Sequence, residues 1–157
     1  TKLAEPTVAA LRKALEDAAG VRGDEVLVEE YIHGREFTVA VLDGRALPVI
    51  EIRAPEGDYD FNNKYFGDAV HYDCPAKLED EAAATLGSLC ERAFAAVGAR
   101  GWSRIDALQR ADGSFALLEI NTSPGMTPHS LVPMAARAVG MDYADLCLKV
   151  LSLARCD

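Results

Sequence analysis

The chain has 157 residues, which suits one domain or one lobe of a larger protein. Half of the residues are apolar and 26% are charged, as in an ordinary globular protein and unlike a disordered chain. Lys and Arg number 16 against 25 Asp and Glu, so the formal net charge of −9 argues against non-specific nucleic-acid binding. No apolar run approaches the length of a membrane-spanning helix, so we expect neither a nucleic-acid nor a membrane partner.

The four cysteines form no C-x-x-C pair and show no metal-finger spacing. This pattern favours reduced thiols in a cytoplasmic protein. The chain begins Thr1-Lys2-Leu3, without an initiator Met or a signal-peptide pattern. We therefore expect an internal segment of a longer chain.

The first part of the chain predicts one helix and then three strands. Apolar residues at three- and four-residue steps predict a helix over residues 5–19, ended by Gly20 and Gly23. Three sequential antiparallel strands are expected next, joined by turns at His33-Gly34 and Asp43-Gly44. They span residues 26–28, 37–42 and 47–52.

A turn-rich segment follows, from residue 54 to residue 73, with Tyr59, Phe61, Tyr65 and Phe66 among its turn residues. Long loops in compact domains are usually functional, so we predict a mobile lid at about residues 55–72. The alternative is a surface loop whose rings pack on the edge of the core.

The second half predicts a helix, a hairpin and two further helices. The helices are expected over residues 79–97, from Ser130 to about residue 138, and over 143–154. The hairpin strands span residues 102–109 and 115–122 around Asp112-Gly113. The whole pattern predicts an α+β fold, an antiparallel sheet with helices packed on one face.

The hairpin around Asp112-Gly113 places polar side chains opposite one another. If the turn is even-numbered and centred on that pair, facing residues have numbers that sum to 225. One face then presents Arg104 opposite Asn121, Asp106 opposite Glu119 and, farther along, Leu108 opposite Leu117. The other face presents Ile105, Ala107, Leu118 and Ile120 to the core.

The polar face of this hairpin suits a metal ion and an anionic group. Asp, Glu and Asn supply the hard oxygen ligands that Mg²⁺ prefers. Arg104 fits if a group that develops negative charge lies between the metal and the guanidinium, as in phosphoryl transfer. The alternative is a solvated polar face on which Arg104 neutralises Asp106.

Two further segments could bind ligands. The free N–H groups of the helix that starts at Ser130 could bind a carboxylate or a phosphate, and plain helix capping is the alternative. Near the front, acidic side chains beside an aromatic and an aliphatic one could hold a nucleoside, and a solvated hairpin edge is the alternative. These front residues are Glu29, Glu30, Tyr31, Ile32 and Glu36.

Five segments carry a family resemblance that covers nearly the whole chain in order. They are residues 28–32 (VEEYI), 34–39 (GREFTV), 64–65 (KY), 101–106 (GWSRID) and 118–127 (LEINTSPGMT), the last followed by HSLVP at 129–133. The chain thereby resembles the D-alanine–D-alanine ligase family of the ATP-grasp superfamily. The resemblance implies ATP-dependent ligation of two D-alanines through an acyl phosphate, for peptidoglycan precursor synthesis. It also implies two Mg²⁺ ions, for which Mn²⁺ can substitute, and a cytoplasmic homodimer for the full-length enzyme.

The resemblance also implies roles for individual residues. Asp106, Glu119 and Asn121 resemble the metal ligands, with Glu119 bridging the two ions. Arg104 resembles the group that stabilises the developing charge, and Tyr65 the lid tyrosine that favours D-alanine over D-lactate. Ser130 and Leu131, with Gly125 nearby, resemble the cradle for the carboxylate of the second substrate. Seven further residues resemble the family's nucleotide contacts: Glu29, Glu30, Tyr31, Ile32, Glu36, Lys64 and Leu108.

The family's N-terminal substrate domain, central-domain lysines and phosphate loop have no counterpart between Thr1 and Asp157. We therefore expect residues 1–24 to be the end of the central ATP-grasp subdomain and residues 25–157 the C-terminal lobe. We expect this segment to be inactive alone. Two rival readings remain: another ATP-grasp carboxylate–amine ligase, and a non-catalytic nucleotide-, metal- or protein-binding module.

Overall fold

The computed structural model describes residues 7–22, 26–53 and 70–155. Backbone contacts divide the chain into two units, Thr1–Ile32 and His33–Asp157. Most of the expected lid, including Lys64 and Tyr65, lies outside the described residues. The end of that expected loop is a short strand, β4 (His71–Asp73), which pairs with β3 (Ile50–Arg53).

The first unit contains one helix, α1 (Val8–Arg22), which continues through Gly20 instead of ending there. Residues 26–32 follow without regular structure, so the strand predicted over residues 26–28 is wrong. Leu27 and Val28 are β-strand formers, but both are largely exposed. A strand also needs a free sheet edge to pair with. The expected neighbour is the strand that begins at Glu36, and both of its edges are already paired with other strands.

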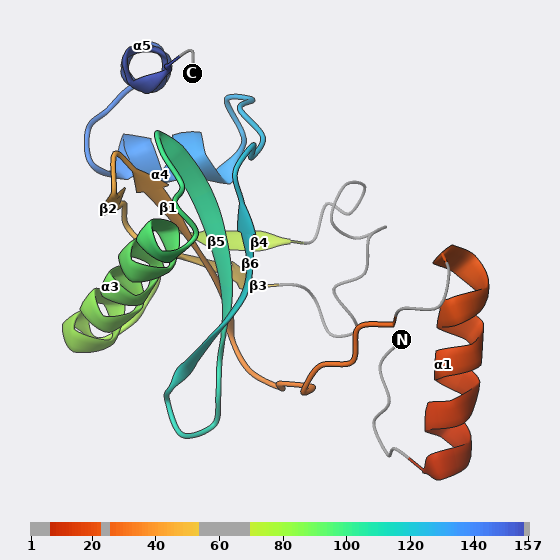
Figure 1. Ribbon diagram of the computed structural model, residues 1–157. Coiled ribbons are helices and arrows are strands. Elements are labelled where there is room, and N and C mark those ends of the chain that lie inside the picture. The colour runs from red at the N-terminus through yellow and green to blue at the C-terminus, as the bar shows by residue number, and fades with distance from the viewer. Residues whose placement is uncertain (1–6, 23–25, 54–69, 156–157) are drawn as a thin grey trace. The chain divides into compact units, whose positions relative to one another are not determined.

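The second unit is built on a six-stranded sheet in the order β4-β3-β1-β5-β6, with β2 beside β1 (Figure 1). Every pair of strands is antiparallel, which confirms the predicted sheet type. Both edges of β1 are taken, one by β3 and the other by β5. The remaining strands are β1 (Glu36–Leu42), β2 (Arg45–Ala46), β5 (Trp102–Gln109) and β6 (Phe115–Asn121).

Three helices pack on this sheet, close to their predicted bounds: α3 (Asp80–Ala96), α4 (Leu131–Ala138) and α5 (Tyr143–Leu153). They cover both faces, so the expectation that all helices lie on one face is wrong. Phe37, Val39 and Val41 contact the α3 side, whereas the alternate residues Ala40 and Leu42 join the α4 side. Successive strand side chains point to opposite faces, so a strand apolar at every position must be covered twice.

The α3 face of the core rests on a stripe of one residue per helical turn: Leu86, Cys90 and Phe94. Burial of the Cys90 thiol raises its pKa to about 12. This thiol is therefore neutral and unreactive at physiological pH. Cys74, Cys90 and Cys147 are free thiols in the structure.

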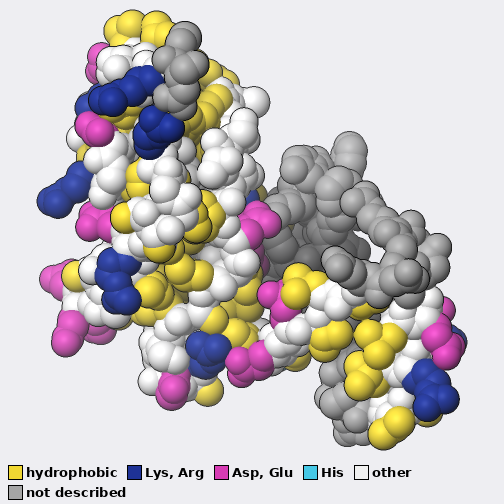
Figure 2. Space-filling view, viewed as in Figure 1, with side chains coloured by type: hydrophobic (Ala, Val, Ile, Leu, Met, Phe, Trp, Pro, Cys, Tyr) yellow, Lys and Arg dark blue, Asp and Glu magenta, His cyan; other side chains and the backbone are white. Residues whose placement is uncertain are grey.

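The surface shown in Figure 2 intersperses acidic, basic and apolar side chains. On that face the Lys and Arg side chains do not gather into one basic patch. Within the described part of the chain, no helix combines the length and apolarity needed to cross a membrane.

Candidate functional site

The β5–β6 hairpin holds the predicted polar residues in the predicted register at its base. Arg104 lies opposite Asn121, and Asp106 lies opposite Glu119. Nearer the tip the register differs, because Leu108 lies opposite Ala116 and not opposite Leu117. Leu117 takes the core position that Leu118 was expected to hold.

A β-bulge between Asp106 and Ala107 accounts for this difference. The hairpin loop has an odd number of residues, because Gln109 pairs with Phe115. Within the loop, the Asp112 carboxylate accepts hydrogen bonds from the amide and hydroxyl of Ser114. The bulge adds one residue to β6. On the side of the bulge away from the loop, the pairs are therefore those expected from the sequence, Asp106 with Glu119 and Arg104 with Asn121. Leu118 is the extra residue and is 47% exposed.

The register of β1 on β5 extends this arrangement across the sheet. Residues that face one another on antiparallel strands project from the same face, so neighbouring rows form a grid of side chains. Six of the residues singled out in the sequence occupy this one face. The rows are Glu36 with Leu108; Thr38 with Asp106 and Glu119; and Ala40 with Arg104 and Asn121.

Arg104 forms the electrostatic centre of the grid. Its Nε and a terminal nitrogen donate to the two oxygens of Asp106, at 2.9 and 2.7 Å. The same terminal nitrogen lies 3.5 Å from a carboxylate oxygen of Glu119. The Asp106 side chain is 7% exposed and that of Arg104 is 15% exposed, so this ion pair is buried, not on a solvated face.

Thr38 completes the surroundings of Asp106. Its hydroxyl donates to Asp106 Oδ1 at 2.6 Å, and Thr38 is 1% exposed. The sequence analysis did not single out Thr38, because one threonine in an apolar strand carries no signal. Only the pairing of β1 with β5 places it beside Asp106.

The oxygen atoms that could bind a cation at the hairpin base come from different side-chain types. In the described ranges, 7–22, 26–53 and 70–155, no three His, Cys, Asp or Glu side chains gather into a metal-binding group. The set at the hairpin base is instead two carboxylates and one carboxamide, which suits a hard cation that keeps water and phosphate ligands. The Oδ1 atom of Asn121 also accepts from the Ser123 amide, at 3.0 Å, which orients the carboxamide.

The loop after β6 leads to the start of α4, where Ser130 holds the N-cap position. Its side chain does not cap the helix. Instead Ser130 Oγ accepts from the Thr127 amide at 3.0 Å and lies 2.9 Å from the Thr127 hydroxyl. Ser130 thus holds the predicted N-cap position, but the alternative of plain capping by its side chain does not occur, and the first amides of α4, including that of Leu131, donate no hydrogen bond to Ser130 Oγ.

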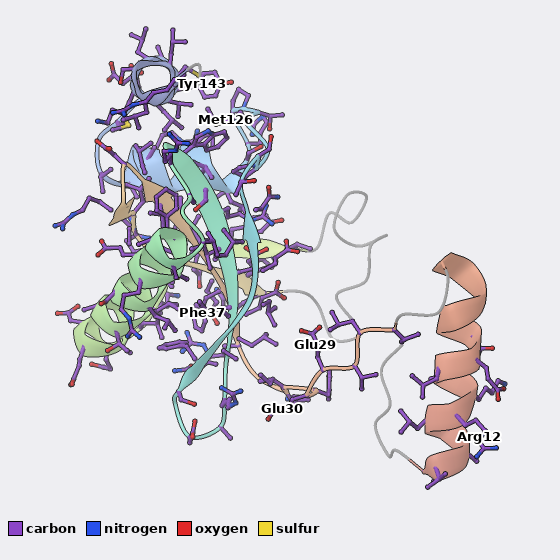
Figure 3. All side chains as sticks on the ribbon, viewed as in Figure 1. Arg12, Glu29, Glu30, Phe37, Met126 and Tyr143 are labelled. Atoms are coloured by element: carbon purple, nitrogen blue, oxygen red, sulfur yellow. The ribbon has the colours of Figure 1, made fainter. Side chains whose placement is uncertain are left out.

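Two side chains that the sequence analysis missed anchor this loop from α4 and α5. Arg137 donates to the Pro128 carbonyl at 2.7 Å, and the Tyr143 hydroxyl donates to the Met126 carbonyl. Met126 and Tyr143 lie side by side at one end of the unit in Figure 3. A Cβ atom at Gly125 would lie 3.1 Å from Ser130 Oγ, so the loop passes Ser130 closely.

The predicted residues near the front of the chain belong to the first unit. Glu29, Glu30 and Tyr31 are exposed and Ile32 is half-buried, all within the first unit. Figure 3 marks Glu29 and Glu30 on the irregular segment of that unit. Their roles stay predictions.

Three comparisons place this geometry among known proteins. A family model described as "D-ala D-ala ligase C-terminus" matches residues 5–152. A D-alanine–D-alanine ligase of Bordetella petrii is 57% identical over 137 residues, covering 85% of this chain and 42% of the relative. The chain spans about half the length of the curated relatives it matches.

Two solved structures share the fold. The D-alanine–D-alanine ligase of Bacillus anthracis, in complex with ATP, has a TM-score of 0.77 and 30% identity, over 92% of this chain and 47% of that one. The VanG D-Ala:D-Ser ligase of Enterococcus faecalis has a TM-score of 0.76 and 30% identity, over 92% of this chain and 43% of that one.

These matches define the class of protein, the C-terminal part of an ATP-grasp ligase. The chain belongs to the D-alanine–D-alanine ligase C-terminal family.

Proposed function

We propose that the protein containing this chain joins two D-alanines into D-alanyl-D-alanine, using ATP and passing through an acyl phosphate. The product would serve peptidoglycan precursor synthesis in the cytoplasm. One observation carries the proposal: Arg104, Asp106, Glu119 and Asn121 project together from the base of the β5–β6 hairpin. Family membership and an ATP-bound relative of the same fold support it.

Asp106, Glu119 and Asn121 would hold two Mg²⁺ ions, with Mn²⁺ as a possible substitute. The residues fit a cation, because the guanidinium of Arg104 already lies within 4 Å of both carboxylates. When bound, the ions neutralise the charge of the ATP phosphates.

Arg104 would supply positive charge to the reacting centre. A carboxylate that accepts a phosphoryl group, and the acyl phosphate that the second amine attacks, both develop negative charge on oxygen. A guanidinium with several donors in one plane can leave Asp106 and meet that charge without losing its own protonation. The buried position of Arg104 strengthens its interaction with a developing charge.

The start of α4 would hold the carboxylate of the second D-alanine. Helix N-termini bind carboxylates through their free amides, here those beside Ser130 and Leu131. Gly125 would leave room for the substrate, because the loop passes Ser130 without a side chain there.

The nucleotide contacts are proposed from the family resemblance. Glu29, Glu30, Tyr31, Ile32, Glu36 and Leu108 are proposed to contact the adenosine, and Lys64 the phosphates. Glu36 and Leu108 face one another on the grid, one row from Asp106, which supports their assignment. Tyr65 is proposed to select the second substrate, and the full-length enzyme is proposed to be a homodimer.

The test is a ligase assay on the full-length protein that contains this chain, with ATP, Mg²⁺ and D-alanine. We expect ADP release that depends on D-alanine and a stoichiometric amount of D-alanyl-D-alanine, measured by mass spectrometry. D-serine and D-lactate serve as competing second substrates, since a relative of the same fold is a D-Ala:D-Ser ligase.

Three outcomes would contradict the proposal. A mixed product formed in preference to the D-alanine dimer would point to a different second substrate. ADP release that needs another carboxylate or amine would favour a different ATP-grasp ligase. Nucleotide binding without turnover would favour a non-catalytic module.

A further inference from the structure

We propose that Thr38 is a positioning residue for the metal-binding carboxylate Asp106. The inference rests on the proposed function, because it takes Asp106 as a ligand of the cation. It adds a residue from β1, a strand that contributes Glu36 but no proposed metal ligand to the site.

The hydrogen bond between Thr38 and Asp106 has the geometry of a charge-assisted contact. The Thr38 Oγ1 atom lies 2.6 Å from Asp106 Oδ1, within the range for a hydroxyl that donates to a carboxylate. The Ile105 carbonyl, at 3.4 Å from the same hydroxyl, is a much weaker acceptor. The hydroxyl proton is therefore directed at the carboxylate.

The hydroxyl is more than the fold requires at this position. Thr38 is 1% exposed in β1, where the residue that it faces on β3 is the buried, apolar Ile50. A valine would fill the same volume and keep the β-branched shape that strands favour. Burying a hydroxyl costs free energy unless it is hydrogen-bonded, and its best partner here is Asp106.

Thr38 matters because the other donor to Asp106 has a second task. Arg104 holds both oxygens of Asp106, but it is the group proposed to meet the charge of the reacting centre. Once Arg104 turns to that charge, Thr38 is the side chain in the described structure that still holds the carboxylate. It binds only Oδ1, so Oδ2 is left to a cation. Residues that orient metal ligands in this way typically change metal affinity or activity by about 10- to 100-fold when they are replaced.

The experiment compares variants of the full-length protein by Mn²⁺ binding with a non-hydrolysable ATP analogue, followed by electron paramagnetic resonance. This readout needs no turnover. We expect Thr38→Val to weaken Mn²⁺ binding about 10-fold or more, and Thr38→Ser to recover most of the wild-type affinity. In the ligase assay, Thr38→Val should raise the Mg²⁺ concentration for half-maximal activity by a similar factor, while kcat at saturating Mg²⁺ falls much less.

Ser103→Ala is the matched control. Ser103 is also a fully buried hydroxyl on the sheet, adjacent to Arg104 in sequence, but it has no hydrogen-bond partner among the residues that the structure describes. Its replacement should leave Mn²⁺ affinity unchanged. If Thr38→Val does not fold, the pair Thr38→Ala and Thr38→Ser gives the same comparison, since both shorten the side chain and only serine keeps the hydroxyl.

The outcomes separate this inference from the proposed function. Wild-type ligation together with unchanged Mn²⁺ affinity in Thr38→Val would overturn the role of Thr38 and leave the function standing. Weakened Mn²⁺ binding in Thr38→Val, together with a wild type that performs no ligation, would support the role of Thr38 and contradict the proposed function. Equal losses in Thr38→Ser and Thr38→Ala, or a wild type that binds no Mn²⁺, would also overturn the inference.

Discussion

The two carboxylates that face each other across the hairpin have contrasting surroundings. The side chain of Asp106 is 7% exposed and bonded to both Thr38 and Arg104, whereas that of Glu119 is 59% exposed and lies 3.5 Å from Arg104. A charge near solvent can be removed at little cost to folding, but a buried paired charge cannot. The same chemical change should therefore have different effects at the two positions.

We predict that Glu119→Gln in the full-length protein lowers kcat by at least about 100-fold and changes the free energy of unfolding by less than about 0.5 kcal/mol. Asp106→Asn should also lower kcat, and should in addition cost about 3 kcal/mol of stability, because the buried Arg104 loses its ion pair with Asp106. Steady-state kinetics and urea denaturation measure the two effects. A Glu119→Gln variant that melts would show that Glu119 is structural and that the metal assignment is wrong.

Gly125 gives a second prediction at a single residue. A Cβ atom there would lie 3.1 Å from Ser130 Oγ, which is held by the Thr127 amide and has little room to retreat. Gly125→Ala should therefore disturb the start of α4 and raise KM for the second D-alanine about 10-fold. KM for ATP serves as the internal control and should stay constant. An equal rise in both constants would mean that the loop does not form the second-substrate site.

Among the secondary-structure elements, the segment that enters β1 passes unusually close to the end of β5. The amide of Gln109 donates to the Arg35 carbonyl at 2.9 Å, and a Cβ atom on Gly34 would lie 1.8 Å from the Gln109 carbonyl oxygen. The Gln109 carbonyl belongs to the backbone, so it cannot move aside without breaking the strand pairing. Only glycine fits at Gly34.

We predict that Gly34→Ala destabilises the protein by about 2 kcal/mol or more. Gly87→Ala is the control: Gly87 lies inside α3, and its added methyl group would meet only Ala46 Cβ, at 3.4 Å. Because alanine is the better helix former, this variant should gain about 0.5–1 kcal/mol. Both values come from chemical denaturation of the full-length protein. A neutral Gly34→Ala would mean that the close approach is not maintained in solution.

The sequence correctly predicted those helices and strands whose pattern lies within their own residues. The period of Leu86, Cys90 and Phe94 and the glycine at 98 mark α3, and the hairpin of β5 and β6 follows from its turn and apolar alternation. The failures all depend on distant partners. Residues 26–28 have strand-forming side chains but no free edge, β4 is too short to show a pattern, and the covering of both faces depends on chain connections.

The same distinction holds within the candidate site. The pairs at the base of the hairpin were predictable, although the β-bulge and the odd-numbered loop that together produce them were not. Thr38 could not be found from the sequence, because its role exists only once β1 lies beside β5.

An ion pair on the face opposite the candidate site should contribute to the stability of the whole second unit. Arg35 donates two hydrogen bonds of 2.8 Å to Glu51, and its guanidinium lies 4.9 Å from the centre of the Phe37 ring. The hydrogen bonds from Arg35 lower the pKa of Glu51 below its ordinary value, against the opposing effect of burial. The folded state therefore favours the ionised carboxylate more than the unfolded state does.

This shift predicts how unfolding depends on pH. Because the pKa of Glu51 is lowered on folding, its contribution is present above the unfolded pKa of about 4.3 and is lost as pH falls through the folded pKa. Glu51→Gln should cost about 1–3 kcal/mol at pH 7 and flatten the decline in stability below about pH 4. Thermal unfolding from pH 2.5 to pH 7 measures both effects. Asp43→Asn, which removes the exposed pair with Lys149, should change stability by less than about 1 kcal/mol; a loss as large as that of Glu51→Gln would contradict the assignment.

The ion pair of Arg104 with Asp106 also bears on how the protein is made. Many small metal-binding domains stay unfolded until their ion arrives, because their ligands repel one another or remain unsatisfied without it. Here the chain carries its own counter-ion, since one guanidinium balances the buried carboxylate and lies near the exposed one. Newly synthesised chains can therefore complete this lobe whatever the supply of divalent ions in the cell. On the proposed function, a shortage of magnesium would leave this lobe folded with its proposed metal site empty, and not misfolded.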